Sequence, residues 1–225
     1  MRYLITLLGL TIGLFLTGAS HAADNALLAK IQNAYGQINS FAADFSQTLT
    51  HRESGAVEKR KGKLEFQKPL LVRWQTAKPH AETLIVNAKE IWDYIPDEEI
   101  AYRYSPAVAQ DSRSIIQVLT GQAKLDKDFD VKAGGKENGL TRLILYPRAP
   151  GPQMVEATIW VDPASGAIQR AKVIDFYGNS NDVAFDSFKP GVKIPAAQFS
   201  FKAPKGVEVE DRIDHKTPER ELFGK

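Results

Sequence analysis

The chain has 225 residues and carries 29 basic against 27 acidic side chains, for a formal net charge of +2, and it contains no cysteine. This balanced charge, with no basic block longer than Glu58–Lys63, makes nucleic acid an unsuitable partner, because binding a phosphate backbone requires dense positive charge. Without cysteine the chain forms no disulfides, so a folded domain must be stabilised by a hydrophobic core, for which this length is sufficient.

Residues 1–22 have the pattern of a secretory signal peptide. Arg2 gives a positive start, Leu4–Leu16 is apolar, and Ser20 and Ala22 supply the small residues of a cleavage site. The apolar run is too short for a membrane anchor, and a polar chain follows it directly. The sequence therefore predicts an exported protein whose residues 23–225 form a single domain.

The first elements after the signal peptide are predicted to be a helix and a series of strands. Between Asp24 and Gly36 apolar side chains recur at helical spacing, Asp24 can cap the helix, and Gly36 can end it. From Phe41 the pattern alternates, and the strand-like runs are "FAADFSQTL", "AVEKRKGKLEF", "LLVRWQT", "AETLIVNA", "EIWDYIP" and "IAYRYS". Their close spacing indicates antiparallel pairing, since parallel strands need long crossovers.

One short helix is predicted to interrupt the strands, over Asp111–Leu119, with Asp111 or Ser112 as its cap and Gly121 at its end. Strand-like runs then resume as far as "AQFSFKAP", and the residues from about 210 onward are polar and expected at the surface or frayed. An antiparallel sheet of this size curls into a barrel or half-barrel, and amphipathic helices can cover its opening. The fold class is therefore mainly β with a few helices.

The sequence has no motif for catalysis, for a cofactor or for a metal held by histidines. The histidines after the signal peptide are His51, His80 and His215, and none has a second ligand at metal spacing. The chain has no nucleophile motif and no phosphate-binding loop. The adjacent carboxylates of residues 97–99 are typical of a solvated turn.

A calcium loop is one alternative that the sequence raises. Asp126, Asp128, Asp130 and Glu137 occupy the ligand positions of such a loop. The position that needs glycine for the sharp turn is Val131, however, and residues 129–131 alternate as a strand does. The sequence favours a strand and hairpin over Asp126–Glu137.

Aromatic side chains on the predicted strands are the remaining feature. They are Trp74, Trp92, Tyr94, Tyr102, Tyr104, Trp160 and Phe176. They can form an ordinary core, or they can line a cavity for an apolar ligand, because a wide curved sheet has more inward surface than its own side chains fill. Composition leaves both interpretations open.

Several short motifs occur in a defined order along most of the chain. They are Phe45 and Gln47, then Gly62, Leu64 and Phe66, then Lys68 and Pro69, then Trp74, then Ile91, Trp92, Tyr94 and Pro96, and finally "FSFKAPKGVEV". Together they span about Phe41 to Val209. In order and spacing they resemble the periplasmic outer-membrane lipoprotein carrier family, LolA.

The resemblance implies an unclosed antiparallel β-barrel with short α-helices forming a lid over a hydrophobic cavity. It implies a monomeric periplasmic chaperone that takes acylated lipoproteins from an inner-membrane ABC transporter and delivers them to an outer-membrane acceptor. The residue before the hinge proline is typically arginine in the family, where it hydrogen-bonds the lid. Here that residue is Lys68, which has a compact charge and no planar fork.

The resemblance also implies a set of functional residues. Lys68 is expected to latch the lid and Pro69 to form the hinge. The residues expected to line the acyl-binding cavity are Trp74, Trp92, Tyr94, Ile115, Val118 and Leu119. Because side chains alternate along a strand, Arg73 is expected on the opposite face from Trp74, in solvent.

Two other functions remain open at this stage. A hydrophobic cavity is equally suited to another lipid or a glycolipid. A similar half-barrel can also serve as a lipoprotein-sensing regulatory module, although such modules usually carry a second domain.

Overall fold

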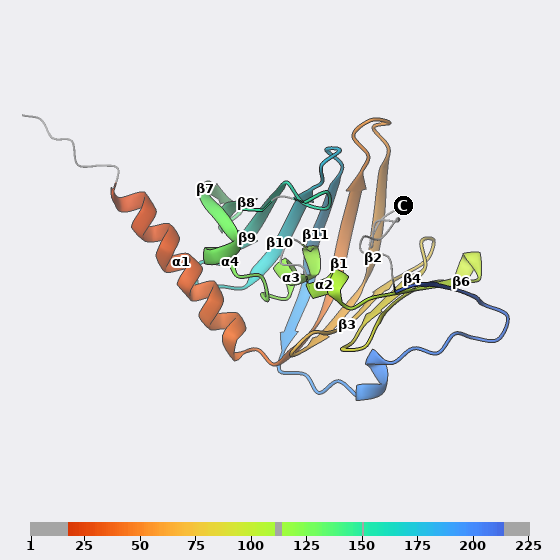
Figure 1. Ribbon diagram of the computed structural model, residues 1–225. Helices are drawn as coiled ribbons and strands as arrows, with labels where there is room; N and C mark the ends of the chain where they lie inside the picture. Colours follow the sequence, from red (N-terminus) through yellow and green to blue (C-terminus); the bar gives the residue numbers. More distant parts are fainter. Residues whose placement is uncertain (1–17, 111–113, 150, 214–225) are drawn as a thin grey trace, which may run out of the picture.

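One sheet of 12 strands forms the body of the protein in the computed structural model, which describes residues 18–110, 114–149 and 151–213 (Figure 1). Its strands are β1 (Ser40–Thr50), β2 (Val57–Gln67), β3 (Leu71–Thr76), β4 (Glu82–Val86), β5 (Ile91–Ile95), β6 (Ile100–Tyr104), β7 (Phe129–Glu137), β8 (Leu140–Pro147), β9 (Glu156–Val161), β10 (Ile168–Ile174), β11 (Ser180–Pro190) and β12 (Glu208–Arg212). The helices are α1 (Gly18–Gln37), α2 (Ala107–Gln110), α3 (Ile115–Leu119) and α4 (Leu125–Asp128), with 3-10 turns η1 (Pro96–Glu98) and η2 (Ala196–Phe199).

The sheet is built from two halves that meet at β1 and β11. Its order is β12-β6-β5-β4-β3-β2-β1-β11-β10-β9-β8-β7, so the chain runs outward from β1 to β6, crosses to β7 and returns to β11. All neighbours are antiparallel except β12, which pairs with β6 in parallel. The two edges, β12 and β7, do not pair with each other, which confirms the predicted mainly-β, unclosed antiparallel sheet.

The crossing from β6 to β7 carries α2, α3 and α4, and Figure 1 shows these helices and α1 on the same side of the curved sheet. The predicted helix over Asp111–Leu119 is present from Ile115. Ser114 caps it by accepting a hydrogen bond from the backbone N–H of Gln117, as a short polar side chain does at an N-cap. The predicted caps, Asp111 and Ser112, lie outside the described residues.

The core lies between the sheet and these helices. Alternation along the strands places one set of side chains inward, among them Phe41, Phe45, Leu64, Phe66 and Trp74, each at most 2% exposed. Ile31 and Tyr35 of α1 and all of the apolar residues of α3 belong to the same hydrophobic cluster. The hydrophobic side chains of α3 therefore face the sheet and not solvent.

The chain after β11 forms an arm over the opposite, outer face of β3 to β5. Arg73 Nη1 donates to the carbonyl oxygen of Gln198 at 3.3 Å, and Asn87 Nδ2 donates to that of Phe199 at 3.2 Å. Arg73 thus lies on the predicted face, but the arm covers it. The arm then enters β12, so the polar C-terminal stretch begins inside the sheet, while residues 214–225 lie outside the described residues.

Two further placements bear on the sequence analysis. Phe176 is in the turn after β10 and is 71% exposed, and not on a strand as predicted. Within residues 18–110, 114–149 and 151–213, no helix has the length and apolar content needed to span a membrane.

Candidate functional site

The inner face of the sheet brings together four of the six predicted cavity residues. Trp74 is 2% exposed, and its ring centroid lies 4.5 Å from that of Phe45. Ile115 is 6% exposed, and Val118 and Leu119 are fully buried. All of them belong to one hydrophobic cluster, in which α3 packs mainly against β10.

Trp92 and Tyr94 lie on the other face of the sheet. On β5 the buried residues Ile91, Asp93 and Ile95 alternate with these two half-exposed aromatics, so the two sets point in opposite directions. The ring of Phe201, on the arm, lies 5.2 Å from the ring of Trp92 and 5.3 Å from that of Tyr94. The structure therefore does not bring Trp92 and Tyr94 together with Trp74 and α3.

Lys68 binds the end of α1. Its ammonium donates to the carbonyl oxygens of Tyr35 at 2.9 Å and Gly36 at 2.7 Å. A cation suits this position, because the last carbonyls of a helix lack intrahelical partners and carry partial negative charge. Within the described residues, the side-chain hydrogen bonds of Lys68 thus lead to α1 and not to α3. Pro69 follows Lys68 in the turn between β2 and β3.

Three more contacts attach α1 to the rest of the protein. The Tyr35 hydroxyl oxygen accepts from the backbone N–H of Ile168 at 3.1 Å. Lys30 Nζ donates to the carbonyl oxygen of Pro163 at 2.7 Å, and Gln32 Nε2 donates to Asp126 Oδ1 at 2.7 Å. Burial raises the pKa of Tyr35 well above its ordinary range, with the Ile168 hydrogen bond opposing the shift.

A polar cluster on the inner side of β2 and β4 was missed by sequence reasoning. Arg60 Nη1 donates to Glu82 Oε2 at 2.6 Å, and Arg60 Nε also bonds Glu58. His80 Nδ1 lies 3.3 Å from Glu58 Oε1. The signal was present in the sequence, because Arg60 is in phase with the inward-facing Gly62, Leu64 and Phe66, although "EKRKGK" reads as a solvated run.

The carboxylates that a calcium loop would use as ligands form hydrogen bonds and ion pairs with other residues. Asp126 accepts from Gln32, and Asp130 lies 2.8 Å from Arg148. Glu137 Oε2 accepts from Trp160 at 3.0 Å and lies 3.4 Å from Arg142. Residues 129–137 form β7, as the strand and hairpin interpretation predicts.

Comparison with known proteins gives consistent matches over most of the chain. The sequence model described as "Outer membrane lipoprotein carrier protein LolA" matches residues 36–202. Outer-membrane lipoprotein carrier proteins of Chromobacterium violaceum and Proteus mirabilis are 26% and 30% identical, over 89% and 81% of this chain and 95% and 87% of their own lengths. A crystal structure described as an uncharacterized conserved protein from Thermus thermophilus matches with a TM-score of 0.54 at 15% identity, over 84% of this chain and 99% of that one, which supports the fold alone.

Proposed function

Because the chain belongs to the LolA family of outer membrane lipoprotein carrier proteins, we propose that it binds the acyl chains of lipoproteins on the inner face of its sheet and carries them across the periplasm. The observation that carries this proposal is α3. It is a short helix, entirely buried, inserted between the two halves of the sheet and packed on its inner face. The apolar surface that α3 covers is the surface that acyl chains would occupy.

The physical need for such a carrier follows from the cost of exposing acyl chains to water. Each buried methylene contributes about 0.8 kcal/mol, so several long chains oppose release into water by tens of kcal/mol. A carrier must shield the acyl chains from water and must still release them. A cavity that the protein's own helices occupy when no cargo is bound meets both requirements, because the free energy of opening subtracts from the affinity for the cargo.

The opening movement involves α1 as well as α3. Both helices belong to the hydrophobic cluster on the inner face, and Lys68 is hydrogen-bonded to the end of α1. We therefore assign the lid to α1 and α3 together, with Trp74, Ile115, Val118 and Leu119 contacting acyl chains. Lys68 acts as the latch on α1 beside the turn that contains Pro69.

The family's function supports the route that we propose for the cargo. The carrier is made with a signal peptide that is cleaved after Ala22, receives lipoproteins from an inner-membrane ABC transporter and passes them to an outer-membrane acceptor. The protein works as a carrier and not as an enzyme. Cleavage after Ala22 falls within α1, and Leu28, Ile31 and Tyr35, which pack into the core, remain in the mature chain.

A release assay tests the proposal directly. Spheroplasts that hold a labelled lipoprotein destined for the outer membrane are incubated with the purified mature protein, and the supernatant is examined for a soluble complex. We expect a one-to-one complex. If a carrier of known activity releases the lipoprotein in parallel and this protein does not, lipoprotein carriage is wrong, and lipid extracted from the purified protein would identify a different ligand.

A further inference from the structure

Three exposed hydrophobic side chains gather at one end of the sheet. Among the residues that the structure describes, four large hydrophobic side chains are exposed, and three of them are Val57, Phe176 and Tyr177. Val57 begins β2 after the β1–β2 turn, while Phe176 and Tyr177 lie in the β10–β11 turn and are 71% and 74% exposed. Figure 1 shows both turns at the same end of the sheet, and only β1 separates β2 from β11. We call these three side chains the aromatic tip.

The β10–β11 turn that carries the two rings is held by several hydrogen bonds. The buried Asp175 carboxylate accepts from the backbone N–H and the Nδ2 of Asn179, both at 2.8 Å. The backbone N–H of Phe176 donates to the carbonyl oxygen of Pro152 at 3.0 Å, and that of Arg52 donates to Asn179 Oδ1 at 3.1 Å. The two rings meet edge to face, with centroids 5.6 Å apart. Their exposure is therefore built into the fold, and clustered exposed hydrophobic side chains are typical of a surface that contacts another molecule.

Four basic side chains surround the aromatic tip. Arg52 lies in the β1–β2 turn, Lys59 and Lys61 are exposed on the outer face of β2, and Lys172 is half-buried on β10. Within the described residues, none of the four is ion-paired. Lys59 is two residues from Val57, about 7 Å along the strand, which is shorter than the screening length of about 8 Å at physiological salt.

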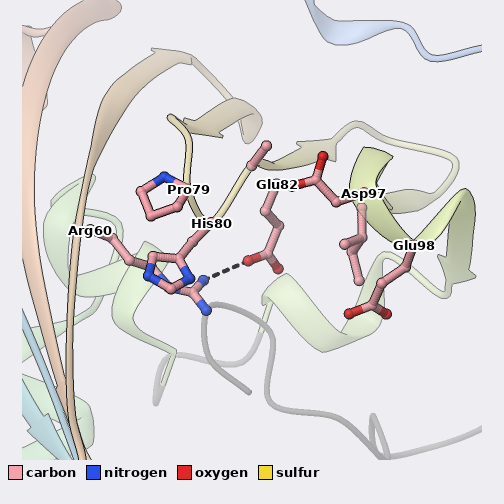
Figure 2. A pocket seen from close by; sticks show the side chains of 8 residues that line it. Arg60, Pro79, His80, Glu82, Asp97 and Glu98 are labelled. Atoms are coloured by element: carbon pink, nitrogen blue, oxygen red, sulfur yellow. Dashed lines mark hydrogen bonds and ion pairs between the residues drawn. The ribbon is translucent and has the colours of Figure 1, made fainter.

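Fewer carboxylates near the tip lack a cationic partner. Glu58 is bonded by Arg60, which Figure 2 shows bonded to Glu82 as well. Asp182 accepts from Arg170 Nη2 at 2.6 Å. Apart from the buried Asp175, the carboxylates near the tip without a cationic partner among the described residues are Glu53 and Glu156. The exposed surface around the tip therefore carries an excess of positive charge.

Exposed aromatic rings with a positive surround match the chemistry of a phospholipid interface. Aromatic side chains are enriched where water meets the bilayer. Basic side chains beside them are attracted to anionic headgroups. A lipid surface also deforms around a convex tip, whereas a protein partner would need a recess of matching shape.

We propose that the aromatic tip docks the protein end-on to a phospholipid surface that carries anionic headgroups. Two rings and one valine bury less apolar surface than one myristoyl chain, which by itself gives only marginal, reversible binding. Docking is therefore weak and brief, which is compatible with a carrier that leaves the surface again. The proposal goes beyond lipoprotein carriage and does not depend on acyl chains binding to the inner face.

The first experiment measures binding of the purified mature protein, without cargo, to sucrose-loaded vesicles. One set contains phosphatidylethanolamine and phosphatidylglycerol, and the other contains only phosphatidylcholine. The bound fraction after sedimentation is followed as lipid is added up to millimolar concentration. We expect binding to the anionic vesicles, weaker binding to the neutral ones, and a loss of this difference at high salt, because salt screens the lysines and the headgroups.

Two variants test the two parts of the surface. Replacing both rings, by Phe176→Ala with Tyr177→Ala, should lower the partition coefficient on anionic vesicles about tenfold or more, because the apolar area that enters the interface is lost. Lys59→Gln should lower it by up to about fivefold on anionic vesicles and leave binding to neutral vesicles unchanged.

Matched controls keep the same chemistry away from the tip. Lys63→Gln removes a lysine that is six residues from Val57 on the same strand, about 20 Å away and beyond the screening length. Val209→Ala removes the fourth exposed hydrophobic side chain, which lies on β12. Both variants should bind as the wild type does.

A fluorescence measurement does not depend on loss of binding. Tyr177→Trp places a tryptophan in the tip, and vesicles with brominated acyl chains quench a tryptophan that enters the interface. We expect stronger quenching of Tyr177→Trp than of the wild-type protein, whose own tryptophans are at positions 74, 92 and 160. Equal quenching would place the tip outside the lipid and overturn the proposal.

The proposal is also overturned if the wild-type protein does not bind anionic vesicles, or if the double variant binds them as well as the wild type. Binding to spheroplast membranes, but not to vesicles made from the lipid extracted from them, would show that the tip contacts a membrane protein instead. Because no cargo is present, these results and the lipoprotein release assay succeed or fail separately.

Discussion

Gly62 on β2 leaves no room for a larger residue. A Cβ at this position would lie 2.1 Å from the carbonyl oxygen of Gln75 and 2.7 Å from the ring of Phe45, its partner across the β1–β2 pair. The Phe45 ring covers Gly62 and also packs against the ring of Trp74. The glycine of the Gly-x-Leu-x-Phe motif is therefore explained by this close approach.

Gly62→Ala should destabilise the protein by about 1–3 kcal/mol, because the added methyl group forces Phe45 or the β3 backbone to move. Chemical denaturation measures the change. Gly36→Ala is the matched control, since a Cβ there meets nothing within 4 Å, and it should leave stability unchanged or raise it by up to about 1 kcal/mol. Equal stability of Gly62→Ala and wild type would contradict the packing argument.

Lys68→Leu removes the two hydrogen bonds to the end of α1 while leaving the core intact. We expect the protein to fold and to form the lipoprotein complex, but to pass its cargo on more slowly, because the closed form that competes with the cargo is weakened. Transfer from the complex to outer membranes measures this. Lys63→Leu, at an exposed position of β2, the strand that precedes Lys68, is the control. Transfer by Lys68→Leu at the wild-type rate would remove the latch from the mechanism.

At the scale of elements, α1 is attached through a tyrosine that is poorly able to ionise. Tyr35 is 2% exposed, and burial raises its pKa above the ordinary value of 10.0. Above that pH the unfolded chain releases the phenolic proton while the folded chain keeps it. The stability that this group contributes is therefore fully present below pH 10 and is lost as pH rises beyond it.

The pH dependence of unfolding tests the attachment of α1. Between pH 9 and 11 the wild-type protein should lose about 1.4 kcal/mol more stability than Tyr35→Phe, which has no proton to release. Denaturation at both values measures the difference between the two proteins, so that other titrating groups cancel. Parallel losses would show that Tyr35 ionises freely and that α1 does not hold it buried.

The arm after β11 stabilises the outer face through Phe201. Truncating this half-buried ring uncovers Trp92 and Tyr94, so Phe201→Ala should cost about 1–2 kcal/mol. Phe176→Ala is a suitable control because that ring is 71% exposed, and it should change stability by less than about 0.5 kcal/mol. A comparison of their denaturation midpoints decides the question, and equal midpoints would mean that the arm contributes no packing.

These elements also show what sequence can and cannot predict. The strands from β1 to β6 and the short helix α3 follow from alternation, turn residues and an apolar cluster, all of which are local. The face on which Trp92 lies cannot be predicted from local sequence, because β5 carries large apolar or aromatic side chains on both sides. The arm that covers its outer side comes from more than 100 residues later in the chain. The same holds for Lys68, whose partners on α1 are 32 and 33 residues away.

At the scale of the whole molecule, the sheet has two open edges, and both are charged. β12 consists of Glu208, Val209, Glu210, Asp211 and Arg212, and the pairing of β7 with β8 is irregular between Ala133 and Lys136. Charge and irregular pairing at an edge oppose association with the edge of another molecule. An unclosed sheet can therefore stay monomeric.

The β1–β11 pair determines how the chain reaches its native state. β1 pairs with β11 from Phe41 with Pro190 to Thr50 with Ser180. The first strand to be synthesised can therefore complete its pairing only after a strand that is synthesised much later. Contacts this distant in sequence slow folding, because a long loop must close before they form. We expect β1 to β6 to assemble first and the β1–β11 seam to form last, which pulse-labelled hydrogen exchange during refolding would measure. Until then the inner face is uncovered, and the newly exported carrier has the same need for protection from water as the lipids it is built to hold.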